Sequence, residues 1–305
     1  MSANEADVTL CASCGIAAGD DIKLKKCTCK LVKYCSVKCQ KDHRPKHKKE
    51  CKKRVADLRD EILFKQPEIT HLGDCPICCV PLPIDSSKSN FMYCCNKLIC
   101  QGCNYARQKR EVEWNLQSKC PFCREPLPIT QEEINERVMK RMEANDPVAI
   151  SHIGKKRCEE EDYEAAFEYF TRAAALGDVD AHFQLSWLYR EGNGVENNEK
   201  KVLHHLEEAA IGGHPSSRCN LGALEAENGQ YDRAVNHFII AAKLGDDISL
   251  DNVKELDRVG CVSEEDFAAA LRGHKAAIDA TKSPQREEAY DFFVRLAAVR
   301  DGKRI

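Results

Sequence analysis

Cysteine spacing constrains the fold of this chain more than any other feature. Sixteen of its nineteen cysteines lie between Cys11 and Cys123. They form short pairs such as Cys11-x2-Cys14, and one chain reversal can aim both sulfurs of such a pair at a single metal ion about 2.3 Å away. Fifteen of them and one histidine provide two sets of eight donors, and each set suffices for two tetrahedral zinc ions. The sequence therefore predicts four zinc ions before residue 130.

Disulfides are the alternative use for so many cysteines. Residues 1–10 are polar and acidic, unlike a signal peptide, and no apolar run reaches the roughly 18 residues of a membrane span. We therefore expect an intracellular protein, cytoplasmic or nuclear, with no membrane contact. In a reducing compartment dense cysteine indicates metal binding.

Charge is unevenly distributed although the formal net charge is only −3. Between Lys23 and Arg54 there are fourteen lysines and arginines against two acidic residues. A basic stretch can attract nucleic acid or acidic partners. However, a zinc ion held by four thiolates carries a net charge of about −2, which nearby lysines offset. Charge compensation is the simpler interpretation, so a nucleic-acid-associated regulator ranks third, behind the two function classes given below.

Composition divides the chain into three parts. Residues 8–54 contain the first cysteine set and residues 72–129 the second, with a short helix predicted over 55–64. Thr130 precedes Glu133 with the spacing of a capping box, and Ala, Glu and Leu then recur at helical spacing. We expect small zinc-bound α+β modules followed by an all-α solenoid of helical hairpins over residues 145–300.

The helical part repeats with a period of about 32–36 residues, the size of a two-helix unit. Four positions recur in each unit, and their occupants are Gly154, Ser186 and Gly222; Phe170, Leu206 and Phe238; Ala174, Ala210 and Ala242; and Gly177, Gly213 and Gly245. We expect the alanines at helix crossings and the last three glycines in left-handed helix caps. Each unit would bury its apolar face against its neighbours, as in an α-solenoid. The insertion Gly192-Asn-Gly-Val195 resembles that of a Sel-1-like repeat, and the shorter turns of the other units resemble tetratricopeptide repeats.

The first cysteine set resembles a MYND zinc finger, which is marked by Tyr34-Cys35-x3-Cys39-Gln40. The resemblance implies interleaved ligands, with one zinc held by Cys11, Cys14, Cys35 and Cys39, and the other by Cys27, Cys29, His47 and Cys51. It also implies a groove for a proline-rich peptide with Gln40 in its wall. Arg44 stands where the family has tryptophan, so peptide binding and a purely structural role both remain open.

The second set resembles an all-cysteine RING finger, marked by Cys75-Pro-Ile-Cys78 and Cys120-Pro-Phe-Cys123. The implied ligand sets are Cys75, Cys78, Cys100 and Cys103 for one zinc, and Cys94, Cys95, Cys120 and Cys123 for the other.

A RING docks a ubiquitin-conjugating enzyme, and the resemblance assigns that role by position. Ile77 in the first pair and Pro121 in the last pair would contact the enzyme, with Trp114 as an aromatic of the groove. Arg124 follows the final ligand and would donate hydrogen bonds that hold the ubiquitin thioester in a reactive geometry. Such catalysis is positioning, without bond chemistry by Arg124 itself.

Two function classes follow from these observations. The first is a RING-type ubiquitin ligase in which the MYND finger and the helical repeats recruit protein partners. The alternative is a non-enzymatic protein–protein interaction scaffold or adaptor whose fingers are structural or bind peptides. His71 is expected on the surface of the linker, and Cys79 is expected to bind no metal.

Overall fold

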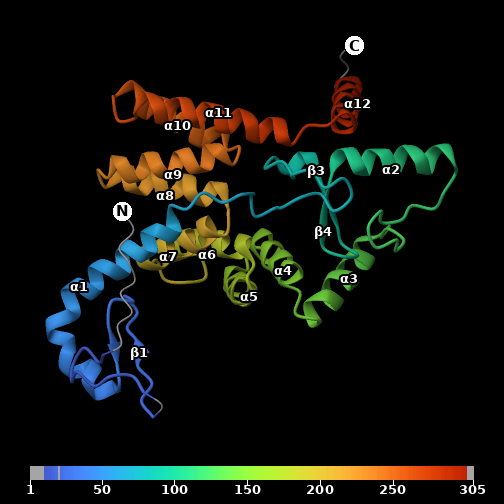
Figure 1. Cartoon of the computed structure of the whole chain (residues 1–305). Helices are drawn as coiled ribbons and strands as arrows, with labels where there is room; N and C mark the ends of the chain where they lie inside the picture. The colour runs from blue at the N-terminus through green and yellow to red at the C-terminus, as the bar shows by residue number, and fades with distance from the viewer. Residues whose placement is uncertain (1–9, 20, 301–305) are drawn as a thin grey trace. The chain divides into compact units, whose positions relative to one another are not determined.

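The computed structural model describes residues 10–19 and 21–300. The chain forms two compact units, Met1–Lys65 and Gln66–Ile305 (Figure 1). Positions 8, 9 and 20 of the first predicted domain lie outside the described residues. None of the helices in the described ranges is both long enough and apolar enough to cross a membrane.

The first unit joins two short antiparallel strands to one long helix. Its elements are β1 (Lys25–Lys26), β2 (Lys33–Tyr34) and α1 (Val37–Leu63). The Ser36 hydroxyl caps α1 by accepting the backbone N–H of Cys39. The helix predicted over 55–64 is thus the last part of α1, which continues through Pro45. The helix begins 18 residues before the predicted start, at Val37, and so also carries the ligands Cys39, His47 and Cys51.

The second unit begins with a β-hairpin followed by a helix. The elements are η1 (Ser86–Lys88), β3 (Ser89–Met92), β4 (Lys97–Cys100) and α2 (Gln101–Glu113). The hairpin register pairs Ser89 with Cys100 and Met92 with Lys97, so the turn holds residues 93–96. Leu82, Met92 and Ile99 form a small apolar core with the cysteines around them. Such a core is too small to stabilise the module unaided, which accords with metal binding.

Helical hairpins make up most of the remaining chain. The helices are α3 (Gln131–Glu143), α4 (Pro147–Glu159), α5 (Tyr163–Ala175), α6 (Val179–Glu191), α7 (Glu199–Ile211), α8 (Pro215–Glu227), α9 (Tyr231–Lys243), α10 (Asp247–Arg258), α11 (Glu264–Ala280) and α12 (Pro284–Arg300). Helices α4/α5, α6/α7 and α8/α9 pair as hairpins, and each hairpin packs on the next (Figure 1). This arrangement is the predicted α-solenoid. The last helix, α12, packs against α2.

Close packing inside each hairpin depends on a small residue opposite a large one. A Cβ atom on Gly154 would lie 2.7 Å from the ring of Phe170, and one on Gly222 would lie 2.7 Å from the ring of Phe238. The glycines predicted to end the second helices have φ of 90°, 84° and 96°, which confirms their left-handed caps. Ala210 and Ala242 are fully buried as predicted. The prediction for Ala174 is wrong, because it is half-buried and its neighbour Ala173 is fully buried.

Candidate metal centres and docking groove

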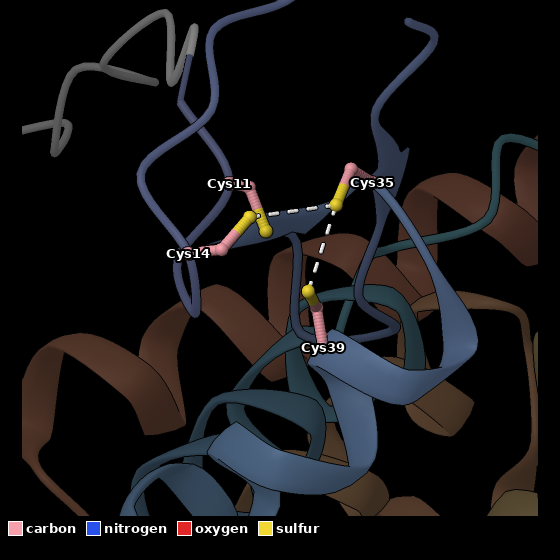
Figure 2. Close-up of side chains that lie close together, drawn as sticks. All are labelled: Cys11, Cys14, Cys35 and Cys39. Carbon is pink, nitrogen blue, oxygen red and sulfur yellow. Dashed lines mark hydrogen bonds between the residues drawn. The ribbon is translucent and has the colours of Figure 1, made fainter.

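The first donor set lies in the first unit, where a chain reversal meets the start of α1. Cys11 and Cys14 come from the reversal, and Cys35 and Cys39 from the end of β2 and the first turn of α1. Figure 2 shows the four side chains pointing toward one another. The Cys35 sulfur lies 3.6 Å from the sulfurs of both Cys14 and Cys39. All four sulfurs lie within 4.8 Å of one another.

The second donor set of this unit combines three cysteines with one histidine. The sulfurs of Cys27 and Cys51 are 3.6 Å apart, and His47 Nε2 lies 3.1 Å from the Cys29 sulfur. His47 is buried and its Nδ1 lies 3.3 Å from a Glu50 carboxylate oxygen. That contact places the hydrogen on Nδ1 and leaves the lone pair of Nε2 directed at the cysteines, as a metal ligand requires.

The other two donor sets lie in the second unit and are also interleaved. The structure brings together Cys75, Cys78, Cys100 and Cys103 in one set and Cys94, Cys95, Cys120 and Cys123 in the other. In the first of these sets the Cys78 and Cys100 sulfurs are 3.8 Å apart. In the other set Cys94 and Cys95 are neighbours in the β3–β4 turn. The Cys94 sulfur lies 3.3 Å from the Cys123 sulfur, and the Cys95 sulfur lies 3.8 Å from the Cys120 sulfur.

These four sets fit zinc and do not fit disulfides. Sulfurs bound tetrahedrally to one zinc ion at 2.3 Å lie about 3.8 Å apart, whereas a disulfide needs about 2.05 Å. The observed sulfur separations of 3.3–3.8 Å match the former. All nineteen cysteines are free thiols in the described structure. Among the residues that the structure describes, four cysteine-rich sites are therefore compatible with zinc, the number predicted.

Thiols within one donor set shift one another's pKa values through hydrogen bonds. A hydrogen bond with the Cys14 thiol, followed by those with Cys39 and Cys11, raises the pKa of Cys35 to about 12. A hydrogen bond from the Cys100 thiol lowers the pKa of Cys75 to about 4. The neighbouring thiols thus stabilise the thiolate of Cys75 in one set and oppose ionisation of Cys35 in another. Binding of zinc would displace the remaining protons.

Three of the Cys-x2-Cys pairs form the same turn. In each, the residue after the second cysteine donates its N–H to the carbonyl of the first cysteine and has a left-handed backbone. These residues are Gly15 (2.9 Å, φ 73°), Cys79 (2.8 Å, φ 55°) and Arg124 (2.9 Å, φ 65°). Glycine suits this conformation, whereas a residue with a side chain is strained in it.

The predicted docking residues are distributed around α2. Ile77 and Pro121 line one groove of about 440 Å³ together with Arg107 and Leu116. Ile77 is 40% exposed. Trp114 lies at the end of α2 and is 72% exposed. Leu116, just after α2, supplies an apolar side chain to the groove lining. Trp114 is not among the described residues that line this groove.

Two further predicted residues lie outside this groove. Arg124 is exposed on the turn after the last zinc-ligand pair. Gln40, in the first unit, is exposed on the first turn of α1, and Arg44 is exposed one turn later. The face of α1 that carries Gln40 is therefore open to solvent within the first unit.

A fifth group of potential metal donors joins the linker to the solenoid. His71 Nε2 lies 2.9 Å from Asp180 Oδ1, and His214 Nε2 lies 3.6 Å from the same oxygen. The expectation that His71 lies on the linker surface is wrong, because its side chain is 11% exposed. Its backbone N–H donates to the carbonyl of Gly213, which draws the linker against the solenoid. Neither Asp180 nor His214 carried a local sequence signal beyond its place in the repeat.

Hydrogen bonding of His214 favours an ion-pair cluster over a metal site at this position. Its Nδ1 accepts the backbone N–H of Ser217 at 3.1 Å and so caps α8. A neutral imidazole whose Nδ1 accepts carries its hydrogen on Nε2, and that hydrogen faces the Asp180 carboxylate. Lys155 Nζ, 3.2 Å from the other carboxylate oxygen, completes the charge balance. Burial, followed by the charge of His71, lowers the pKa of His214 to about 3, so this histidine stays neutral.

Comparison with known proteins identifies two modules. Residues 11–51 match the MYND finger, and residues 153–178, 179–214 and 215–246 match the Sel1 repeat. Neither match covers residues 72–129.

Two bacterial proteins are similar to part of the chain. HcpC of Helicobacter pylori strain J99 is 38% identical over 60 residues, which is 20% of this chain and 21% of that protein. The uncharacterized protein NMB1327 of Neisseria meningitidis serogroup B is 41% identical over 57 residues, 19% of this chain and 12% of that protein. The chain thus spans about a fifth or less of the length of these relatives.

Two solved structures show partial similarity. The first is c5321, a protective antigen of uropathogenic Escherichia coli with an SLR fold (TM-score 0.41, 20% identity, 56% of this chain and 37% of that chain). The second is a Sel1 repeat protein from Oxalobacter formigenes (TM-score 0.41, 18% identity, 60% of this chain and 73% of that chain). The architecture itself rests on the repeat matches and on the observed helical hairpins.

Together the matched modules and the donor sets define the protein at a coarse level. A MYND finger and Sel1 repeats are protein-interaction modules, and four Cys/His sets are compatible with zinc. The chain therefore combines modules of the protein-interaction type with four sites compatible with zinc.

Proposed function

We propose that residues 72–129 form a RING-type finger and that the protein is a ubiquitin ligase. One observation carries the proposal: Ile77 and Pro121, which are far apart in the sequence, line a single groove along α2. A groove between two zinc-bound turns and a helix suits a rigid partner with an apolar loop. The partner we infer is a ubiquitin-conjugating enzyme, and the solenoid and the MYND finger would hold substrate or accessory proteins.

The role proposed for Ile77 is docking. Its side chain is 40% exposed in the free protein and would lose this exposed area against the partner. Arg107, which lines the groove and is 10% exposed, pairs with Glu111 at 2.5 Å, so its charge is already compensated within α2. The docking energy would therefore come mainly from apolar contact at Ile77 and Pro121.

The role proposed for Arg124 is to position the charged conjugating enzyme. Its backbone is left-handed at φ 65°, which is unfavourable by about 1 kcal/mol or more for a residue with a side chain. Glycine occupies the same turn position in the first unit, at Gly15. The presence of an exposed arginine in a strained turn supports a function for its guanidinium group. That group would donate hydrogen bonds to ubiquitin and to the enzyme and hold the thioester for attack.

Arg124→Gly separates the function of the side chain from its effect on folding. The change removes the guanidinium and relieves the backbone, so thermal stability should be unchanged or higher. Ubiquitin discharge from a charged conjugating enzyme should slow about 10-fold or more, since charge-assisted hydrogen bonds contribute about 1.5–3 kcal/mol. Cys79→Gly is the matched control, because it relieves the same turn in the first pair and should leave the discharge rate unchanged.

Docking is tested by a second pair of variants. Ile77→Ala should weaken binding of the conjugating enzyme, on the order of 10-fold, by removing apolar contact. Val112→Ala removes an 83% exposed apolar side chain of α2 that does not line the groove, and it should have no effect. If the parent protein discharges no ubiquitin with any conjugating enzyme tested, the ligase proposal fails. The alternative is then an adaptor that binds a proline-rich peptide beside Gln40.

A further inference from the structure

The C-terminal helix α12 lies against the donor set of Cys75, Cys78, Cys100 and Cys103, although about 180 residues separate them in the sequence. The guanidinium of Arg286 makes four hydrogen bonds. Nη1 donates to the carbonyls of Pro81 and Thr281, both at 2.7 Å. Nη2 donates to the carbonyl of Val80 at 2.9 Å and to the sulfur of Cys78 at 3.5 Å. One arginine thus holds the turn that carries Cys78 and contacts a metal-donor sulfur directly.

The surface of α2 is shaped to admit this helix. A Cβ atom on Gly102 would lie 2.9 Å from Cγ of Arg286 and 3.0 Å from its backbone, so the absence of a side chain at this position permits the approach. Gln285 Nε2 donates to the carbonyl of Gly102 at 3.2 Å. Gly102 also lies directly before the ligand Cys103, so the contact reaches both ligand pairs of the site.

Contacts continue along the same face of α2. The ring of Tyr105 lies 4.9 Å from that of Phe292, and Lys109 Nζ lies 3.0 Å from Glu288 Oε1. Gly102, Tyr105 and Lys109 have the three- and four-residue spacing of one helix face. The docking of α12 is therefore built from a series of contacts along the helix and is not a single accidental approach.

We propose that Arg286 is a positioning residue for the zinc site of Cys75, Cys78, Cys100 and Cys103, and that α12 is an integral part of this finger. Four thiolates around one zinc ion carry a net charge of about −2. A guanidinium that donates to one of those sulfurs offsets part of the charge and orients the ligand turn. Loss of such outer hydrogen bonds typically weakens metal binding 10- to 100-fold. Metal retention at this one of the four sites thus depends on the C-terminal helix.

Zinc release from the fully loaded full-length chain tests the proposal. The zinc transferred to a colorimetric chelator is followed with time, and alkylation of newly exposed thiols, read by mass spectrometry, identifies the site. In Arg286→Met one zinc of four should leave about 10- to 100-fold faster, with early alkylation of Cys75, Cys78, Cys100 and Cys103. Arg295→Met, an exposed arginine of the same helix, is the matched control and should behave as the parent.

Two further variants keep the test decisive. Arg286→Lys retains the charge but not the forked set of donors, so it should restore zinc retention only in part. Gly102→Ala leaves Arg286 intact but displaces α12, so it should accelerate loss of the same zinc even if Arg286→Met does not fold. Release from both Arg286→Met and Gly102→Ala at the parent rate, or faster release from a different site, would overturn the proposal.

Discussion

At the scale of single residues, the zinc-ligand turns impose a left-handed backbone on residues whose side chains disfavour it. Lys30, Cys79, Asn96 and Arg124 each follow a cysteine ligand and have φ between 50° and 65°. This left-handed region is unfavourable by roughly 1–2 kcal/mol for an ordinary residue. Metal binding contributes roughly 10–16 kcal/mol per structural zinc and can maintain several such turns. Ligand spacing in the sequence predicted where these turns are, but not which strained residue retains a functional side chain.

His214 leads to a prediction about pH at the same scale. Burial lowers its pKa from 6.5 in the unfolded chain to about 3 in the folded protein. Between these values the unfolded chain binds the additional proton, so stability should fall as the pH falls from about 6.5 toward 3, by at most about 1.4 kcal/mol per pH unit. The pKa of Asp180 is also lowered, since the His71 hydrogen bond and the Lys155 charge outweigh its burial. Asp180 therefore adds a loss of stability in the same direction below about pH 4.

His214→Asn isolates this contribution. Asparagine can still cap α8 but does not titrate, so urea unfolding should show a smaller loss of stability between pH 6.5 and 4 than in the parent. His214→Ala should be less stable than His214→Asn by about 1 kcal/mol at every pH, because it lacks the cap and neither side chain titrates. Acid also protonates the zinc ligands, but equally in parent and variants, so the difference between them reports on His214. Identical slopes for parent and His214→Asn would show that this cluster does not determine the acid sensitivity.

At the scale of elements, complementary volumes set the geometry of each helical hairpin. Two of the repeats oppose a glycine to a phenylalanine, and the middle repeat has Ser186 and Leu206 at the equivalent positions. Both of these side chains are buried. The repeat pattern predicted which positions correspond, because the period is visible in the sequence. It did not predict which of two adjacent alanines is buried, because that depends on the rotation of α5 about its axis.

A double-mutant cycle tests this complementarity. Gly222→Ser should destabilise the protein by about 1–3 kcal/mol, since a Cβ atom would collide with the Phe238 ring. Phe238→Leu should also destabilise it, by on the order of 1 kcal/mol, through the space left behind. The combined variant reproduces the pair of the middle repeat and should lose less than the sum, by about 0.5–3 kcal/mol. Strict additivity in urea unfolding would contradict the proposed packing.

At the scale of the whole molecule, zinc-dependent and zinc-independent parts coexist in one chain. The donor sets lie before residue 125, whereas α4–α9 bury their own apolar residues without any of these ligands. Fully loaded protein should contain close to four zinc ions. A strong chelator should unfold the two finger regions, because structural zinc contributes roughly 10–16 kcal/mol to folding. Most of the helical circular dichroism should remain.

Metal analysis and hydrogen exchange on the full chain check this prediction. Amides of β3, β4 and the first turns of α1 should lose protection after chelation, whereas those of α4–α9 should keep it. Two or fewer zinc ions in fully loaded protein would mean that one pair of donor sets is wrongly assigned. A collapse of the α4–α9 signal would mean that the solenoid depends on the fingers for its own stability.

The sequence by itself determined the features that are local or periodic. Cys-x2-Cys spacing predicted the metal-binding turns, because the two donors must lie on one chain reversal, and the repeat of about 32–36 residues predicted the helical hairpins. Only the tertiary structure brought Arg286 to Cys78, joined His71 to Asp180 and His214, and placed Leu116 in the groove where Trp114 was expected. The first two of these features join segments that belong to different repeats or modules. No short-range spacing encodes them, since they depend on how α12 and the linker return to surfaces formed by distant parts of the chain.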